Sequence, residues 1–292
     1  MSYGGARMSK SLNQLLRPLV PNIRLRISHA EPGVALQVRL RQHLGLVTRG
    51  AKAYESAYVE ALRGCVRSGD TVFDVGANIG FYSVLFSRWV GPDGKVICFE
   101  PDPDNVLLLR RNLELNNCDN AVVREVAMGR TQEVSVFSRD PTTGATGHLG
   151  KGPTYGETVF GAGKEFLMPV KTETLDAEAQ ALESPDVIKL DIEGGEYEVL
   201  CGGSRVLREA RPLVISELSA WADDGAYGKT RAELAIELFQ DLNYLILDLD
   251  TGEEVPHDGE RAWMVMCIPR DRLREERFAK FALKMKESLA GR

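Results

Sequence analysis

The sequence predicts an α/β fold, a doubly wound, mostly parallel, Rossmann-like seven-stranded sheet with an antiparallel C-terminal hairpin and a helical N-terminal extension. Short apolar runs alternate with helical patterns five times after residue 50. These runs are apolar on both faces, as in parallel strands that helices cover on each side. The last two runs follow each other with no helix between them, which is typical of a hairpin.

The elements follow from the period of the apolar residues and from the glycines that interrupt it. The expected strands are Thr71–Val75, Lys95–Phe99, Ala121–Ala127, Val134–Ser138, Met168–Thr172, Val187–Leu190, Leu213–Ser216, Tyr244–Leu249 and Trp263–Ile268. The expected helices are Ala53–Val66, Phe81–Val90, Asp104–Asn116, Glu196–Glu209, Arg231–Leu242 and Arg272–Leu289. In such sheets ligands bind outside the carboxyl ends of the strands, so the residues that follow each strand are the ones to inspect.

Composition sets the class of protein. The 292 residues are 43% hydrophobic and 27% charged, which is enough to bury one large core. No run of about 18 apolar residues occurs, so no membrane span is expected, and no secretory signal is recognised. The five cysteines are scattered without a C-x-x-C pair, which argues against a disulfide framework or a structural zinc site. A cytoplasmic protein is expected.

Charge is unevenly spread. Residues 1–50 hold eight basic residues against one acidic residue, so this segment carries +7 and residues 51–292 carry −13 of the net −6. An acidic body does not suit a nucleic-acid partner. Leucines between residues 12 and 19 have helical spacing that Pro18 and Pro21 end, so residues 1–50 are interpreted as a basic extension or helical cap, with a targeting segment as the alternative. Residues 51–292 form the main domain.

The stretch VFDVGANIGFYS places Asp74, Gly76, Asn78 and Gly80 in and after the first strand. Glycines there let the backbone turn tightly and let a ligand approach the start of the next helix. A dinucleotide site would have G-x-G-x-x-G, whereas this turn reads D-x-G-x-x-x-G. An acid before the first glycine suits an amine-bearing ligand such as S-adenosylmethionine better than a pyrophosphate.

Glu100 ends the second strand, 24 residues after Gly76. A carboxylate at this place can accept both ribose hydroxyls of NAD or of S-adenosylmethionine. Together with the turn it favours S-adenosylmethionine. Two alternatives stay open: an NAD-dependent oxidoreductase or epimerase, and a non-catalytic Rossmann-like scaffold.

The ordered motifs VFDVGANIGFYS, FEPDP, NLELNN, VKTETLD and IKLDIEGGEYEVL resemble those of the FkbM-type methyltransferases, a branch of the class I S-adenosylmethionine enzymes. The resemblance covers roughly residues 54 to 220. It implies O-methylation of a hydroxyl on a natural product, sugar or glycolipid by in-line displacement. The acceptor would be a small molecule or glycan. An acidic carrier protein, which would meet the basic front end, and a homo-oligomer are the further partner hypotheses.

The resemblance also implies a set of cofactor-binding residues. They are Glu55, Asp74, Gly76, Asn78, Gly80, Glu100, Pro101, Asp102, Val126 and Ala127. Asp74 and the turn would line the methionine part of the cofactor, Glu100 the ribose, and Val126 with Ala127 the adenine.

Carboxylates follow the next two strands of the sheet. The stretch DVIKLDIEGGE ends a strand in Asp191, Glu193 and Glu196, and Glu217 ends the strand after it. Asp191 is the candidate general base for an acceptor hydroxyl. Catechol O-methyltransferase, a relative in fold, has magnesium-binding acids at such strand ends, so the resemblance implies Asp191 and Glu217 as a Mg²⁺ pair. Glu193 and Glu196 are expected to be scaffold.

A second candidate base, His148, lies in a long loop with seven glycines between residues 144 and 163. Glycine-rich loops of this length often act as lids or binding loops.

Overall fold

The structure is a computed structural model of the 292-residue chain. It describes seven stretches: residues 20–28, 31–50, 56–140, 143–150, 166–218, 229–255 and 264–278. Within these stretches no helix is both long and apolar enough to pass through a bilayer.

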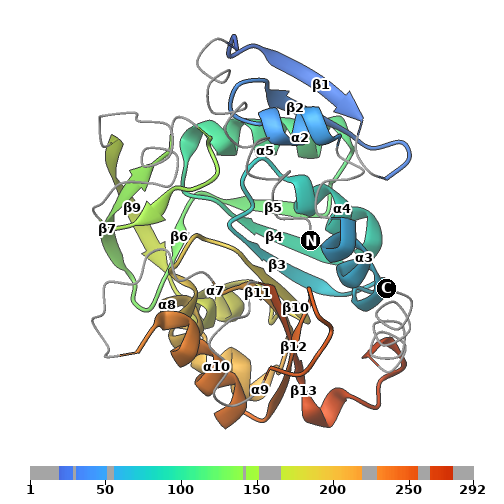
Figure 1. Cartoon of the computed structure of the whole chain (residues 1–292), viewed down its shortest axis with the longest axis vertical. Coiled ribbons are helices and arrows are strands. Elements are labelled where there is room, and N and C mark those ends of the chain that lie inside the picture. The colour runs from blue at the N-terminus through green and yellow to red at the C-terminus, as the bar shows by residue number, and fades with distance from the viewer. Residues whose placement is uncertain are drawn as a thin grey trace, which may run out of the picture.

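The large sheet contains, among the described residues, seven strands in the order β12–β13–β11–β10–β3–β4–β5 (Figure 1). Their bounds are β3 Thr71–Val75, β4 Lys95–Phe99, β5 Ala121–Arg124, β10 Val187–Leu190, β11 Leu213–Glu217, β12 Tyr244–Asp248 and β13 Met264–Pro269. The five strands from β11 to β5 are parallel, and the hairpin β12–β13 joins β11 antiparallel. The predicted sheet and hairpin are confirmed.

The order of the strands defines a topological switch point. From β3 the chain proceeds outward through β4 to β5, then returns to β10 on the other side of β3 and proceeds to β11. Helices that leave β3 and β10 therefore lie on opposite faces. A crevice outside the carboxyl ends of β3 and β10 is the expected ligand site of such a sheet.

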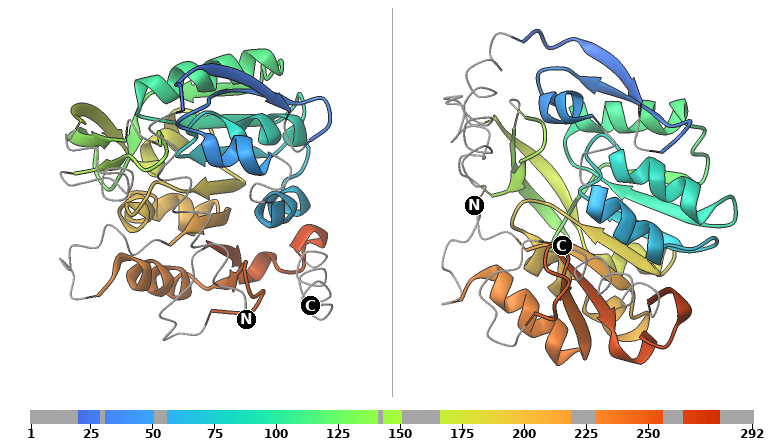
Figure 2. Two further views of the ribbon diagram at one scale, coloured as in Figure 1. Left: turned by 45° about the horizontal axis from the view of Figure 1, so that its top comes forward. Right: turned by 45° about the vertical axis from the view of Figure 1, so that its right-hand side comes forward.

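Helices cover both faces of the large sheet (Figure 2). On one face, α3 Ser56–Cys65, α4 Phe81–Val90 and α5 Pro103–Leu115 share one apolar core. On the other face lies a second core built on α7 Leu175–Ala181, α8 Glu196–Cys201, α9 Ser204–Glu209 and α10 Arg231–Asp241. A short 3₁₀ turn, η2 Arg270–Arg272, follows β13. The sheet is thus doubly wound.

One expected helix is divided in two. The helix expected over Glu196–Glu209 breaks between α8 and α9 at Gly202 and Gly203. A Cβ on Gly202 would lie 2.2 Å from the carbonyl oxygen of Gly129, so this glycine lets two backbones approach closely.

A smaller sheet lies beside the large one and was not anticipated (Figure 1). Its order is β6–β9–β7–β8, with bounds β6 Ala127–Met128, β7 Glu133–Arg139, β8 His148–Leu149 and β9 Phe166–Glu173. The strand expected over Ala121–Ala127 therefore ends at Arg124, and Ala127 enters the small sheet instead. β7 and β9, the strands expected on either side of the glycine-rich loop, pair antiparallel.

The part of the N-terminal extension that the structure describes is not the predicted helical cap. A helical cap was expected, but Arg24–Ser28 and Ala35–Arg39 form an antiparallel hairpin, β1–β2, followed by the short helix α2 Leu44–Arg49. The hairpin lies over α5, because Asn112 of that helix and its C-cap residue Asn116 each exchange two hydrogen bonds with the β2 backbone. Leucines 12 to 19, on which the helical prediction rested, lie outside the described residues, as does most of the expected C-terminal helix.

Candidate functional site

The turn from β3 into α4 begins at Gly76. Gly76 has φ +79°, and a Cβ there would lie 1.9 Å from the carbonyl oxygen of Asp191. The amides of Gly76 and Ala77 both donate to the carbonyl of Phe99 at 3.0 Å. Gly80 closes the turn at φ +86°, where a Cβ would meet Leu109 at 2.7 Å. Both predicted glycines are therefore required by geometry, and the turn fits against the exit of β10.

Glu100 leaves β4 beside this turn and is buried. One carboxylate oxygen accepts the Asn78 amide at 2.8 Å, and the other accepts the Asp102 amide at 2.9 Å. Burial raises the pKa of Glu100 to about 7, and the two amide hydrogen bonds only partly oppose that rise. The structure thus brings together Asn78 and Glu100, two of the candidate cofactor-binding residues.

Asp74 points into the interior. Its carboxyl group is fully buried, accepts a hydrogen bond from the Ser83 hydroxyl at 2.6 Å and lies 3.7 Å from the Lys189 ammonium. Burial raises the pKa of Asp74, and the charge of Lys189 opposes this. Gly76 and Asn78 in the turn that follows are half-buried, whereas the Asp74 side chain is an internal partner of Lys189.

Asp102 holds two elements together. It caps the N-terminus of α5 by accepting the Asp104 amide at 2.8 Å, and Arg139 of β7 donates to both of its carboxylate oxygens at 2.8 Å. Pro103 occupies the first turn of the helix, as is usual after such a cap. Asp102 therefore joins the small sheet to α5, a role that the sequence reading did not assign to it.

The remaining cofactor candidates have separate positions. Pro101 is half-buried between Glu100 and Asp102. Val126 and Ala127 are buried where the chain passes from the large sheet to the small one, directly after β5. Glu55 lies outside the described residues.

A segment of the glycine-rich loop is held against the turn. The amide groups of Asn78 and Asn105 both donate to the carbonyl of Gly144, at 2.9 and 2.8 Å. Asn105 also donates a weaker hydrogen bond, at 3.5 Å, to Glu100. The loop after β7 is thereby fixed beside Glu100, and Asn105 joins the site without having been predicted from the sequence.

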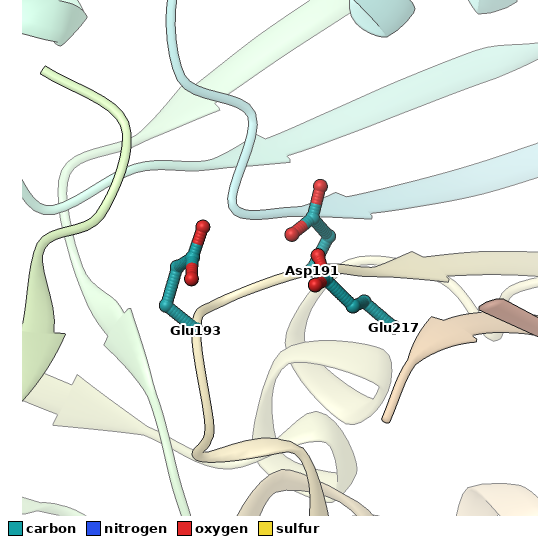
Figure 3. A group of neighbouring side chains, drawn as sticks. All are labelled: Asp191, Glu193 and Glu217. Atoms are coloured by element: carbon teal, nitrogen blue, oxygen red, sulfur yellow. The ribbon is translucent and has the colours of Figure 1, made fainter. Parts of the chain in front are cut away.

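Three carboxylates gather where β10 and β11 end (Figure 3). Oxygens of Asp191, Glu193 and Glu217 all lie within 4.8 Å of one another, and all three residues are half-buried. Glu193 has φ +63° in the turn after β10. Glu193 was expected to be scaffold, and the structure places its carboxyl group beside those of Asp191 and Glu217.

The three acids differ in protonation. Burial would raise the pKa of Asp191, but the Lys189 ammonium 3.2 Å away holds that pKa below its ordinary value. Burial raises the pKa of Glu217 to about 10, and the charge of Asp191, to which its carboxyl group is hydrogen-bonded, adds to the rise. Burial and the same neighbour raise the pKa of Glu193 to about 8. Near pH 7, Asp191 is the charged member of the cluster.

Glu196 is scaffold, as expected. It is buried, and one carboxylate oxygen accepts the amides of Ile192 and Gly194, each at 3.1 Å. These bonds close the turn that carries Glu193, so Glu196 holds the cluster in place. Burial raises the pKa of Glu196 to about 7.

Lys189, like Asn105, is a residue of this site that was not predicted from the sequence. It occupies the third position of β10, is 5% exposed and contacts both Asp74 and Asp191. A lysine inside the otherwise apolar run VIKL was the available signal, because a lysine is rarely buried in a strand unless its charge is paired.

His148, the other predicted base, lies in β8 and pairs with Ser138 of β7. Its side chain is half-buried in the small sheet. No hydrogen bond among the described residues connects its imidazole to the cluster of Asp191, Glu193 and Glu217.

Comparison with known proteins assigns the family. A family model described as the methyltransferase FkbM domain matches residues 74–250, more than half of the chain. The chain belongs to the FkbM methyltransferase family. The match begins at Asp74 and includes Glu100 and the whole carboxylate cluster, so the candidate site lies inside the family domain.

Two curated relatives from the comparison carry methyltransferase names. Hexuronic acid methyltransferase AglP of Haloferax volcanii is 29% identical over 173 residues, 58% of this chain and 65% of that protein. Methyltransferase sdnD of Sordaria araneosa is 31% identical over 159 residues, 46% of this chain and 61% of that protein. This FkbM chain therefore spans less than two thirds of the length of either relative.

Among solved structures, an FkbM methyltransferase from Methylobacillus flagellatus overlaps 90% of this chain and 60% of that chain. The sequence identity is 17% and the TM-score is 0.43. At that score the overlap adds nothing to the assignment of the family.

Proposed function

We propose that this protein is an S-adenosylmethionine-dependent O-methyltransferase in which Asp191 accepts the proton of the acceptor hydroxyl. The observation that carries this proposal is the position of Asp191. It is the charged member of an acidic cluster at the switch point, and its backbone touches Gly76 of the glycine turn. The family match supports the cofactor, and the relatives' names support the class of reaction.

The residues around the turn fit the proposed cofactor. Oε2 of Glu100 accepts the Asn78 amide and keeps a second lone pair for a ribose hydroxyl, whereas Oε1 accepts the Asp102 amide and a long hydrogen bond from Asn105 that a second ribose hydroxyl would have to replace. Gly76 and Asn78 are half-buried rather than buried, so the turn is accessible for the methionine part. When bound, S-adenosylmethionine supplies an electrophilic methyl group on a sulfonium.

The contribution of the protein is then to orient the acceptor and take up its proton. An aliphatic hydroxyl is a weak nucleophile until its proton is shared with a base. Asp191 is 28% exposed and ionised, so it can accept that hydrogen bond from the crevice. The neighbouring Glu193, with a pKa of about 8, is the stronger base of the two and is the alternative proton acceptor.

The test of this proposal is methyl transfer from tritiated S-adenosylmethionine to a panel of hydroxylated acceptors. Hexuronic acids belong in the panel because AglP is named for them. We expect Asp191→Asn to lower turnover by about 10²–10⁴-fold, the usual contribution of a general base. The matched control is Asp119→Asn, an exposed aspartate between α5 and β5, which should transfer methyl groups as the wild type does. Equal turnover by both variants would remove Asp191 from the reaction.

The pH profile separates the two acids. If Asp191 is the proton acceptor, turnover at saturating cofactor does not rise with pH through about 8, because the lowered pKa of Asp191 leaves this carboxylate already ionised there. If Glu193 is the acceptor, turnover rises with pH through about 8, and Glu193→Gln abolishes the rise. The second profile would transfer the role from Asp191 to Glu193.

Mg²⁺ is a further proposal for the same cluster. Three carboxylates offer the oxygen ligands that a hard divalent cation prefers. Binding would have to displace protons from Glu217 and Glu193, which are protonated near neutral pH. Calorimetric titration with MgCl₂ in two buffers of different ionisation enthalpy should therefore show release of one to two protons on binding. The Glu217→Gln variant should not show this binding. Absence of binding heat in both buffers at millimolar Mg²⁺ would contradict a Mg²⁺ site and would leave proton transfer as the proposed role of the cluster.

A further inference from the structure

Lys189 lies between the exits of the two strands that border the switch point. It pairs in register with Asp74 of β3, and its ammonium is 3.1 Å from the carbonyl oxygen of Gly76 and 3.2 Å from a carboxylate oxygen of Asp191. The ring of Tyr82 lies 5.3 Å from the same ammonium. A buried ammonium is costly unless its charge and its donors are satisfied, and these groups satisfy it.

The contact with Gly76 concerns the first peptide of the cofactor turn. Gly76 has φ +79°, and its amide is already bonded to Phe99. The carbonyl oxygen of Gly76 accepts a hydrogen bond from the Lys189 ammonium. Gly76 is half-buried, so its carbonyl would be only partly hydrated without this donor, and the hydrogen bond from Lys189 stabilises this conformation of the turn.

The contact with Asp191 concerns the opposite side of the crevice. The Asp191 amide donates to the Val75 carbonyl at 3.1 Å, so the ends of β3 and β10 are already joined through their backbones. Lys189 adds a side-chain link between the same two ends, because one ammonium touches both the Gly76 carbonyl and the Asp191 carboxylate. The distance between the turn and the carboxylate is thereby fixed.

We propose that Lys189 is a positioning residue for methyl transfer, which ties the turn that binds the cofactor to the carboxylate that receives the acceptor. This inference rests on the proposed function. In-line displacement holds the reacting atoms about 3 Å apart, and displacement of either side by about 1 Å costs on the order of 10²-fold in rate. A link between the two sides is therefore a means of setting that distance.

A purely structural role is the competing explanation, since Lys189 is also the counter-ion of the buried Asp74. The test separates the two by measuring affinity for S-adenosylhomocysteine by calorimetry, which reports only on folded protein. Lys189→Met is compared with the wild type, and the double variant Asp74→Asn/Lys189→Met is compared with Asp74→Asn. In the second pair no buried carboxylate at position 74 needs a counter-ion.

We expect loss of the ammonium to weaken S-adenosylhomocysteine binding by about ten-fold in both comparisons, the effect of losing one charge-assisted hydrogen bond. Lys189→Arg, which keeps the charge and the donors, should recover most of the affinity. Lys95→Met is the matched control: this lysine is exposed at the amino end of β4, bonded to Glu183, and its loss should leave binding unchanged.

Three results would overturn the proposal. One is unchanged affinity in Lys189→Met. Another is a loss seen only when Asp74 is intact, which would make Lys189 a counter-ion and nothing more. The third is failure of both methionine variants to fold while Lys189→Arg folds and binds normally, which would make its role structural. If the wild type itself bound no S-adenosylhomocysteine, the proposed function would fail first, and that result is distinct from the other three.

Discussion

Gly76 and Asp191 are in contact although 115 positions separate them in the sequence. The contact exists because Gly76 lacks a Cβ and adopts φ +79°, which lets the exit of β10 lie against the exit of β3. The candidate base and the candidate cofactor turn are therefore parts of one packed unit. A substitution in either one should therefore displace the other.

Replacement of Gly76 by alanine tests this contact. The new Cβ would lie 1.9 Å from a backbone oxygen, and L residues are disfavoured at this φ. We expect Gly76→Ala to destabilise the protein by roughly 2–4 kcal/mol, by strain and overpacking together, and to abolish S-adenosylhomocysteine binding. Chemical denaturation and calorimetry measure the two effects. Gly69→Ala is the control for a positive φ alone, because a Cβ there meets nothing within 4 Å.

At the scale of elements, α5 is the part of the scaffold that joins the site to its surroundings. Its N-cap, Asp102, binds Arg139 of the small sheet. Asn112 in its last turn and its C-cap residue Asn116 bind the N-terminal hairpin. Asn105 in its first turn holds the loop carbonyl of Gly144. One helix thus holds three separate segments, two at its N-terminal end beside Glu100 and the hairpin at its C-terminal end.

Asp102→Ala should loosen the small sheet. The variant loses the cap of α5 and leaves the Arg139 guanidinium with Asp104 as its remaining carboxylate partner. We expect a loss of roughly 2–4 kcal/mol of stability, the sum of a cap and charge-assisted hydrogen bonds. Relative to the wild type, amide hydrogen exchange in the variant should accelerate more in β7 than in β3. Uniform destabilisation of both sheets would contradict the role of Asp102 as a local tie.

The elements also show what sequence reasoning can reach. β3, α4, β4 and β10 have the bounds that the apolar runs and glycines predict, because each is specified by its own residues. The pairing of the small sheet was not predicted, because β6, β7 and β9 pair across long intervals that no local pattern encodes. The hairpin β1–β2 was not predicted, because the asparagines that bind it lie at the C-terminal end of α5, far away in the sequence.

The site shows the same division. Gly76, Gly80 and Glu100 were predictable from strand–turn–helix order. Lys189 was readable in principle, yet its three oxygen partners come from β3, the turn and β10, and only the fold brings them together. Glu193 was assigned to the scaffold because sequence does not show that the turn after β10 folds back toward Glu217.

For the whole molecule, buried carboxyl groups at the switch point determine how stability depends on pH. Burial raises the pKa values of Glu100 and Glu196 to about 7 and of Glu193 to about 8, from an ordinary 4.5. Between these values the folded protein binds more protons than the unfolded chain. The contribution of these groups to stability is therefore full below about pH 4.5 and is lost as pH rises through 7 to 8.

We therefore expect the ligand-free protein to melt at a higher temperature at pH 5.5 than at pH 8.5. Glu193→Gln should reduce the difference, because the amide cannot ionise. Thermal unfolding followed by circular dichroism at the two pH values measures both. A melting temperature that increases from pH 5.5 to 8.5 would mean that these carboxyl groups are not the dominant titrating groups in this range.

We expect this protein to bind the cofactor of a methyltransferase through Glu100, beside the ends of β3 and β10. The measurement is calorimetric titration with S-adenosylhomocysteine, with NAD as the competing ligand and Glu100→Ala as the variant. The wild type should bind S-adenosylhomocysteine and not NAD, with affinity reduced at least about ten-fold in Glu100→Ala. Binding of NAD alone, or equal S-adenosylhomocysteine affinity in the wild type and Glu100→Ala, would contradict it.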